Sequence, residues 1–328
     1  MNNENCDTRC AGMPLFQSNT HLAGGLLVRA GIPHRGGKLA FHAFKESFAA
    51  MVSANAFWNP ARQEFHFPDA TDLTELDFAL DSAGFTAMQL WKTRGKQAGI
   101  AGVYPWSYEQ YVELASLCGA SWFAQPDMCC EPEIATDREA IDYRIRATAT
   151  MLEGTLRVVY AWQERLSRDC DSRTVSNLVR VPVPVIQGYS VDEYRRSLDL
   201  LLSVWERWRP WLGEPTLIGL GSVCRRNLND PRHGLYAVLA GLEGHLPPGS
   251  KLHLFGVKGQ CLEKLRAFDW IASVDSMAWD YGARVDARER AIANTIAHRS
   301  AVMSRWMDSA RTRATPTVGD QHRLVLAA

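Results

Sequence analysis

The chain has 328 residues, of which 46% are hydrophobic and 22% charged, and its formal net charge at pH 7 is zero. This composition is typical of a folded globular protein and excludes an intrinsically disordered chain. Because the charge is balanced, a nucleic-acid partner would have to bind a local basic surface. No stretch is long and apolar enough to cross a membrane, and the N-terminus lacks the features of a secretion signal. We therefore expect a cytoplasmic protein without a membrane partner.

The eight cysteines show no spacing typical of a zinc site. Cys6/Cys10 and Cys129/Cys130 are the only close pairs, and no second pair of cysteines or histidines follows either at zinc-ligand spacing. In a cytoplasmic protein such cysteines are expected to be free thiols. We expect neither a metal site nor a cofactor.

The first part of the chain predicts two strands and a helix. Residues 1–20 are polar and turn-rich, which is typical of a loosely held tail. The first strand is predicted at 38–44, and a second apolar run ends at Asp81, just before Gly84. Residues 107–119 begin with a serine and end with a glycine around helically spaced apolar residues, which predicts a helix.

The middle of the chain continues this alternation. A strand is predicted to end at Asp127, and the periodicity of residues 136–167 predicts a long helix. Residues 181–190 form a short apolar run whose prolines favour an edge or barrel setting. An amphipathic helix is predicted at 191–208 and a further strand at 216–227.

Residues 251–279 are predicted to form a strand, a helix and a second strand, which together make a βαβ unit. The second strand ends in a carboxylate, Asp275. A polar residue at the carboxyl end of a buried parallel strand occupies the position where α/β folds keep their chemistry. Asp275 is therefore the first candidate for a reacting group, against the alternative that it only caps a turn.

The repeated alternation of strand and helix predicts an α/β fold with parallel strands, and a single (β/α)8 TIM barrel fits it best. A doubly wound open sheet is the alternative, but no strand is followed by a complete nucleotide-binding glycine loop. We expect a barrel domain at 21–283. A basic C-terminal helix and tail at 284–328 would pack on the outside of the barrel.

In a barrel, strand ends that are far apart in sequence converge on one mouth. None of the polar residues at these strand ends is a histidine or a lysine, which argues against Schiff-base and histidine-dependent chemistry. Three carboxylates without a metal cluster fit nucleophilic displacement with acid–base assistance, as in retaining glycosyl transfer. The residues expected at the mouth are Asp81, Asp127, Gln187, Gly221 and Asp275.

Six short motifs lie at or near these strand ends. They are DSAGF (81–85), PDMC (126–129), VIQGY (185–189), IGLGS (218–222), HLFGVKG (253–259) and SVDSMAW (273–279). In this order, over about residues 76–279, the chain resembles the tRNA-guanine transglycosylase superfamily. It is most similar to the DNA-directed branch, the DpdA-type enzymes that insert 7-deazaguanines into DNA.

The resemblance implies a role for each matched position. Asp275 would be the nucleophile that attacks C1′ and expels guanine, and Asp81 would be the acid/base for the departing and incoming bases. Asp127 would accept hydrogen bonds from the Watson–Crick edge of the base, whereas Gln187 and the backbone at Gly221 would read its exocyclic oxygen. The neighbouring motif residues expected to bind the base are Ser82, Phe85 and Gly188.

The chain departs from the tRNA-directed enzymes in two places. No cysteine follows Cys261, so their C-terminal zinc site is absent, and the residues after Asp275 lack the basic loop associated with tRNA enzymes. Asp280 is an alternative nucleophile because it lies close to Asp275 in sequence. The implied partners are DNA, a 7-deazaguanine base such as preQ0 (7-cyano-7-deazaguanine), and partner proteins of a DNA-modification system.

Base exchange in DNA requires the target base to leave the stack, and basic residues near the mouth are expected to hold the phosphates around it. Two alternatives stay open, namely base exchange in tRNA and a catalytically silent barrel that binds nucleic acid. The residues expected to bind nucleic acid are Lys92, Arg94, Lys96, Arg225 and Arg226, each of which could equally be a solvated loop charge.

Overall fold

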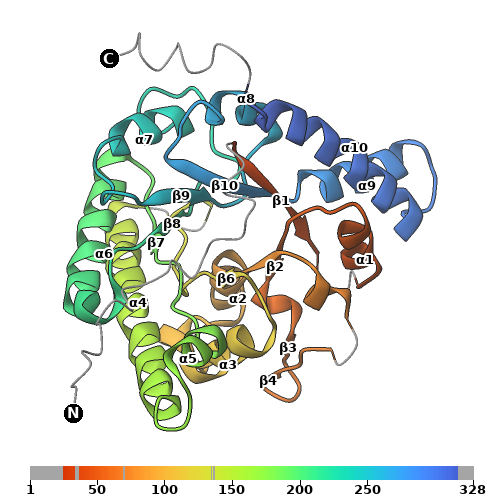
Figure 1. Cartoon of the computed structure of the whole chain (residues 1–328). Coiled ribbons are helices and arrows are strands. Elements are labelled where there is room, and N and C mark those ends of the chain that lie inside the picture. Colours follow the sequence, from red (N-terminus) through yellow and green to blue (C-terminus); the bar gives the residue numbers. More distant parts are fainter. Residues whose placement is uncertain (1–24, 34–36, 69–70, 134, 136, 317–328) are drawn as a thin grey trace, which may run out of the picture.

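The computed structural model in Figure 1 describes residues 25–33, 37–68, 71–133, 135 and 137–316. The tail expected at 1–20 lies outside these residues. In this part of the chain, no helix combines the length and the apolar character that crossing a membrane requires.

A curled sheet of parallel strands occupies the centre of the molecule, with helices around it (Figure 1). Within the described residues the sheet has eight strands in the order β6-β5-β2-β1-β10-β9-β8-β7. They are β1 (Leu27–Ile32), β2 (Ala50–Ser53), β5 (Phe78–Asp81), β6 (Trp122–Phe123), β7 (Val185–Ile186), β8 (Leu217–Leu220), β9 (Lys251–Leu254) and β10 (Ile271–Ser276). A separate antiparallel hairpin is formed by β3 (Trp58–Asn59) and β4 (Glu64–Phe65).

The sheet curls so that the first and last strands in sequence are neighbours, with Leu27 of β1 opposite Ser273 of β10. Its two edges, β6 and β7, meet at one isolated bridge between Ala124 and Val183. The fold is therefore α/β and barrel-like, as predicted, but the hydrogen-bonded ladder is not continuous around the ring. β6 and β7 follow each other in the order of the sheet's strands along the chain, yet they form its two opposite edges, which does not fit a doubly wound sheet.

The strand predicted at 38–44 is wrong, because these residues lie in helix α1 (Gly37–Lys45). Leu39 and Ala43 are buried whereas Phe41 is exposed. A strand would place all three side chains on one face, while a helix separates the middle one from the other two. The first two strands of the sheet, β1 and β2, flank this helix and were not predicted, because short apolar runs carry little periodicity.

The later helices follow the predicted order. Ser107 begins α3 (Tyr108–Leu117) with a capping box to Gln110, and Ser190 begins α6 (Val191–Leu212) with one to Glu193. The long helices α4 (Arg138–Leu166) and α6 lie side by side on one flank (Figure 1). The other α-helices of the described residues are α2 (Gly84–Arg94), α5 (Ser172–Leu178), α7 (Leu235–Leu242), α8 (Leu262–Leu265), α9 (Ala278–Glu289) and α10 (Ile296–Ala314).

The C-terminal helices complete the outer layer. α10 packs against β1, α1 and α8, so it covers the outside of the sheet at β1 (Figure 1). Its contact face is apolar, with Met303, Met307 and Ala310 buried. The boundary expected at residue 283 falls inside α9. The described part of the basic C-terminal segment therefore belongs to the helical layer around the sheet.

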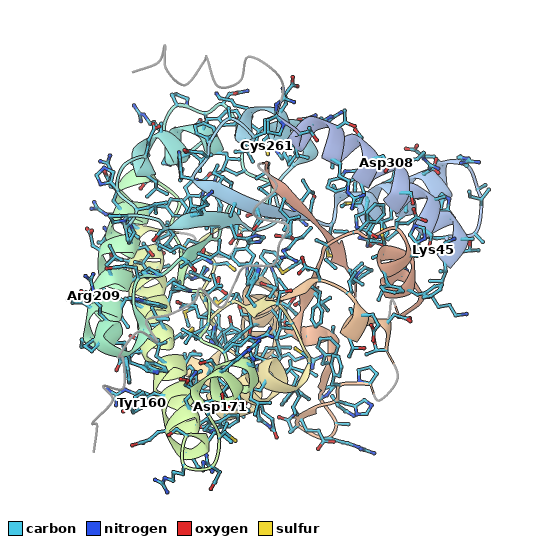
Figure 2. All side chains as sticks on the ribbon, in the orientation of Figure 1. Lys45, Tyr160, Asp171, Arg209, Cys261 and Asp308 are labelled. Carbon is cyan, nitrogen blue, oxygen red and sulfur yellow. The ribbon has the colours of Figure 1, made fainter. Side chains whose placement is uncertain are left out.

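Side chains fill the interior of the curled sheet (Figure 2). Trp122 and apolar residues from β2, β5, β7 and β8 form a small buried cluster there. Arg29 of β1 is fully buried, and its Nη1 donates to a carboxylate oxygen of Asp77 at 3.1 Å. His253 of β9 and Ser273 of β10 are also fully buried. The interior thus holds polar groups beneath the carboxyl ends of the strands.

Candidate active site

Five residues expected at the mouth lie at the carboxyl ends of five parallel strands. Asp81 ends β5, Asp275 is the second-last residue of β10, and the other three follow β6, β7 and β8. The charges of Asp127 and Asp275 both raise the pKa of Asp81, and Asp127 is hydrogen bonded to Gln187. Gln187 in turn lies against Gly221. The five residues therefore form one group at one end of the sheet.

Asp275 has one carboxylate oxygen held by the protein. Its Oδ1 accepts a hydrogen bond from the backbone N–H of Gly256 at 2.8 Å, and Nε2 of His253 lies 3.4 Å from the same oxygen. The side chain is 11% exposed. Oδ2 has no hydrogen-bond partner among the described residues, so it is the oxygen available to a ligand.

Asp81 is the acid–base candidate of the group. Its Oδ2 accepts a hydrogen bond from the backbone N–H of Ala83 at 3.0 Å. Burial raises the pKa of this carboxyl to about 7, and the charges of Asp127 and Asp275 act in the same direction. The hydrogen bond from Ala83 partly offsets these effects. A carboxyl with a pKa near 7 exists in both forms at neutral pH, so it can both give and take a proton.

Asp127 is held on several sides. Ser82 Oγ donates to its Oδ1 at 2.7 Å, and Gln187 Nε2 donates to its Oδ2. The hydroxyl of Tyr104 accepts from the backbone N–H of Asp127 at 2.9 Å and donates to its backbone oxygen at 2.7 Å. Burial raises the pKa of Asp127, and the hydrogen bonds from Ser82 and Gln187 act against that change. Nothing in the sequence signals the part played by Tyr104, which lies in the loop between α2 and α3.

Gln187 links Asp127 to a second buried carboxyl group. Its Oε1 accepts from Ser222 Oγ at 2.5 Å, and Glu131 Oε2 lies 3.2 Å from the same hydroxyl oxygen. Burial raises the pKa of Glu131. Ser222 and Glu131 were not among the predicted site residues. Ser222 does end the IGLGS motif, which was the one sequence signal for it.

Two glycines make room for this network. A Cβ at Gly84 would overlap Asp127 Oδ1, and a Cβ at Gly221 would overlap the amide of Gln187. The backbone N–H of Gly221 donates to the oxygen of Ile186 at 3.0 Å within the sheet. It is therefore not available to read a base, contrary to expectation, and the glycine serves to admit the Gln187 side chain.

Phe85 and Gly188 differ in their surroundings. Phe85, in the first turn of α2 and four residues after Asp81, is 39% exposed. An exposed aromatic ring next in sequence to Gly84, which packs against Asp127, offers a face on which a base can stack. Gly188 instead accepts a hydrogen bond at its carbonyl oxygen from Arg226 at 3.1 Å, and a Cβ there would press on the first turn of α6. Its contacts are therefore structural.

The basic residues after Asp81 are exposed on one edge of the mouth. Lys92 and Arg94 lie in the last turn of α2, and Lys96 follows it. Lys92 Nζ donates to the backbone oxygen of Glu133, at 3.1 Å, in the loop after β6. This contact places the end of α2 beside a loop on the mouth side of the sheet.

Arg225 and Arg226 differ sharply although they are adjacent. Arg225 is exposed, whereas Arg226 is 6% exposed and donates to the backbone oxygens of Ser222, Gly188 and Tyr189. Its guanidinium carbon also lies 4.7 Å from the ring centroid of Tyr189. The expectation that Arg226 contacts phosphate is therefore corrected, because its donors are used to hold the loops after β7 and β8.

Asp280, the alternative nucleophile, is a structural carboxylate. It is 3% exposed and lies in the first turn of α9. Arg299 of α10 donates from Nε to Asp280 Oδ1 at 3.0 Å, and Arg284 Nη2 lies 3.2 Å from Oδ2. Both oxygens are thus occupied by ion pairs, one within α9 and one that joins α9 to α10, whereas Asp275 keeps one oxygen free.

The mouth therefore combines a carboxylate with one free oxygen, a carboxyl with a pKa near 7, and a carboxylate–amide pair. Among the described residues, no group of three or more His, Cys, Asp and Glu side chains is placed to hold a metal ion. A carboxylate nucleophile beside a carboxyl that can give and take a proton is suited to displacement at an anomeric carbon.

A family model, DpdA (DeoxyPurine in DNA protein A), matches residues 62–321. The chain belongs to this family. The DpdA family is the DNA-directed 7-deazaguanine transglycosylase family, so the resemblance drawn from the six motifs is confirmed at the family level. The match includes all five strand-end residues, from Asp81 to Asp275. A search of curated proteins finds no match to the chain.

Proposed function

We propose that this DpdA-family chain exchanges guanine in DNA for a 7-deazaguanine base, such as preQ0, through a covalent ester between Asp275 and C1′ of the target nucleotide. The observation that carries the proposal is that the two carboxyl groups at the mouth have different environments. Asp275 presents a free Oδ2, while burial raises the pKa of Asp81 to about 7. Family membership supports DNA as the substrate.

The exchange would take place in two displacements. In the first, Asp275 Oδ2 attacks C1′ as the C1′–N9 bond breaks, and the leaving guanine keeps the electron pair and takes a proton from Asp81. In the second, the carboxylate of Asp81 removes the N9 proton of the incoming base. N9 then attacks C1′, and the ester bond to Asp275 breaks. Two displacements at one carbon restore its original configuration.

The pair formed by Asp127 and Gln187 fits one edge of a guanine-like base. A carboxylate accepts from N1–H and the 2-amino group, and a side-chain amide can donate to O6. In the structure these two side chains are hydrogen bonded to each other. A bound base would replace that contact with its own complementary groups, while Phe85 would cover its face.

Trapping of a covalent adduct tests the proposed function directly. The protein is incubated with a guanine-containing DNA oligonucleotide, denatured and analysed for a DNA-linked species. An RNA stem-loop of the same sequence serves as the comparison. An adduct with DNA is expected. An adduct with RNA alone would assign the chain to tRNA exchange, and no adduct with either would favour a silent binding barrel.

Asp127→Ala is expected to weaken base recognition more than folding. Removing the carboxylate leaves buried N–H groups of the base unpaired, at about 1–3 kcal/mol each. The KM for the incoming base should therefore rise roughly 10- to 100-fold. Incorporation of labelled guanine at varied concentration measures this, and thermal melting controls for the fold. Incorporation equal to that of wild type would mean that Asp127 only shapes the loop.

Arg225→Ala should change DNA binding, whereas Arg226→Ala should lower the stability of the fold. The exposed Arg225 is proposed to contact phosphate, with Lys92, Arg94 and Lys96. Its loss should therefore reduce the slope of log affinity against log salt by about 0.9 for a duplex contact or about 0.7 for a single strand. Arg226→Ala leaves buried carbonyl groups unpaired and should cost about 2–4 kcal/mol of stability. DNA titrations at several salt concentrations and thermal melts measure both effects. Identical salt slopes for wild type and Arg225→Ala would remove Arg225 from the DNA contact.

A further inference from the structure

A polar pair lies one layer beneath the nucleophile of the proposed reaction. β9 and β10 are paired with His253 opposite Ser273, and both side chains are fully buried. Because residues two apart in a strand point to the same face, Ser273 and Asp275 point the same way. His253 therefore lies beside Ser273 and below Asp275. Its Nδ1 is 2.8 Å from Ser273 Oγ, and its Nε2 is 3.4 Å from Asp275 Oδ1.

The charge state of the ring follows from its surroundings. Burial lowers the pKa of His253 by more than the neighbouring Asp275 raises it, and the charge of Arg29 lowers it further, so the imidazole is neutral at pH 7. Trp122 and Phe255 pack edge-on against the ring, with centroids at 4.9 and 4.6 Å. These contacts fix the plane of the imidazole, and with it the direction in which its two nitrogens point.

A neutral imidazole has one N–H, and its neighbours decide where that hydrogen lies. The carboxylate oxygen near Nε2 can only accept, whereas the hydroxyl near Nδ1 can donate. The favourable arrangement therefore has the Ser273 hydroxyl donating to Nδ1 and the Nε2–H directed at Asp275 Oδ1. A separation of 3.4 Å is long for a hydrogen bond, and catalytic contacts often shorten when substrate binds.

We propose that His253, with its tautomer fixed by Ser273, is a positioning residue that acts with the Gly256 N–H to hold Oδ1 of Asp275 and direct Oδ2 at C1′. This inference rests on the proposed function, and it explains why one oxygen attacks and not the other. When Oδ2 forms the bond to C1′, Oδ1 becomes the carbonyl oxygen of the ester. When the ester breaks, the Nε2–H again stabilises the carboxylate that leaves.

Two amide variants separate positioning from packing. In His253→Gln the side-chain amide can reach the place of Nε2 and donate to Asp275, whereas in His253→Asn it reaches only the place of Nδ1. The rate of adduct formation with the DNA oligonucleotide in a single turnover should stay within about 5-fold of wild type for Gln. It should fall about 100-fold for Asn. Affinity for the same oligonucleotide should not change in either variant.

A matched control exists in the outer helical layer, where Nε2 of the half-buried His42 in α1 lies 2.9 Å from Ser304 Oγ in α10. His42→Asn should leave both the rate and the affinity unchanged. Ser273→Ala removes the donor to Nδ1 and should slow adduct formation about 10-fold without changing DNA affinity. Equal rates for His253→Gln and His253→Asn, with wild type active, would overturn the positioning role alone. Absence of any adduct with wild type would overturn the proposed function as well.

Discussion

Asp275→Asn is expected to abolish covalent adduct formation while leaving the fold intact. The amide is close in size to the carboxylate and can still accept from the Gly256 N–H, but it is too weak a nucleophile to form the ester with C1′. The rate of adduct formation should fall by at least about a thousandfold. Denaturing gels of protein mixed with DNA oligonucleotide measure the adduct, and thermal melting checks the fold.

The control for this variant is Asp280→Asn. Asp280 is even more buried but is paired with Arg284 of its own helix and with Arg299 of α10, so its replacement should lower stability and leave the adduct chemistry in place. If Asp275→Asn kept near wild-type activity while Asp280→Asn lost it, the assignment of the nucleophile would have to be reversed.

The second large effect concerns Asp81 and pH. The pKa of about 7 means that Asp81 is protonated below that pH, in the form that can give a proton to the departing guanine. Adduct formation should therefore fall about tenfold per pH unit above pH 7. Asp81→Asn should slow the step by about 10²- to 10⁴-fold and remove this inflection. Single-turnover rates between pH 5.5 and 9 measure both. An inflection near pH 7 that persists in Asp81→Asn would assign it to another group.

Stability provides an independent check on the same group. Between the ordinary value of 3.8 and about 7, the folded protein holds a proton on Asp81 that the unfolded chain has released. Unfolding then releases a proton, so the contribution of Asp81 to stability falls as pH rises through this range and is constant above it. Asp81→Asn should therefore raise the melting temperature, relative to wild type, more at pH 8 than at pH 5.

The strands that could best be predicted from the sequence are those followed by a candidate site residue. Runs that stop at Asp81, Asp127 and Asp275 combine apolar character with a polar end, and that combination predicted both the parallel sheet and the group of residues at its mouth. β1 and β2 carry no such signal. The run at 38–44 is largely apolar and contains no glycine or proline, so its sequence is compatible with both a strand and a helix. Only the burial of Leu39 and Ala43 beside an exposed Phe41 shows that it is a helix.

Side-chain partners across the sheet could not be predicted in the same way. Arg225 and Arg226 are the same residue type and are adjacent in sequence. Arg225 is nevertheless exposed, whereas Arg226 is buried and donates to carbonyl oxygens in the loop after β7. His253 opens the HLFGVKG motif, but no role was predicted for its side chain. Its relation to Asp275 depends on the register of β9 against β10, which no local pattern encodes.

The single bridge between Ala124 and Val183 gives the sheet a seam, and Asp127 and Gln187 stand on opposite sides of it. Their side chains supply a contact across an edge where the backbone ladder is nearly absent. A base that inserts between them would take over that contact and tie the two edges together through itself. Binding of the base and closure of the ring of strands would then be thermodynamically linked, so that a bound base stabilises the closed barrel.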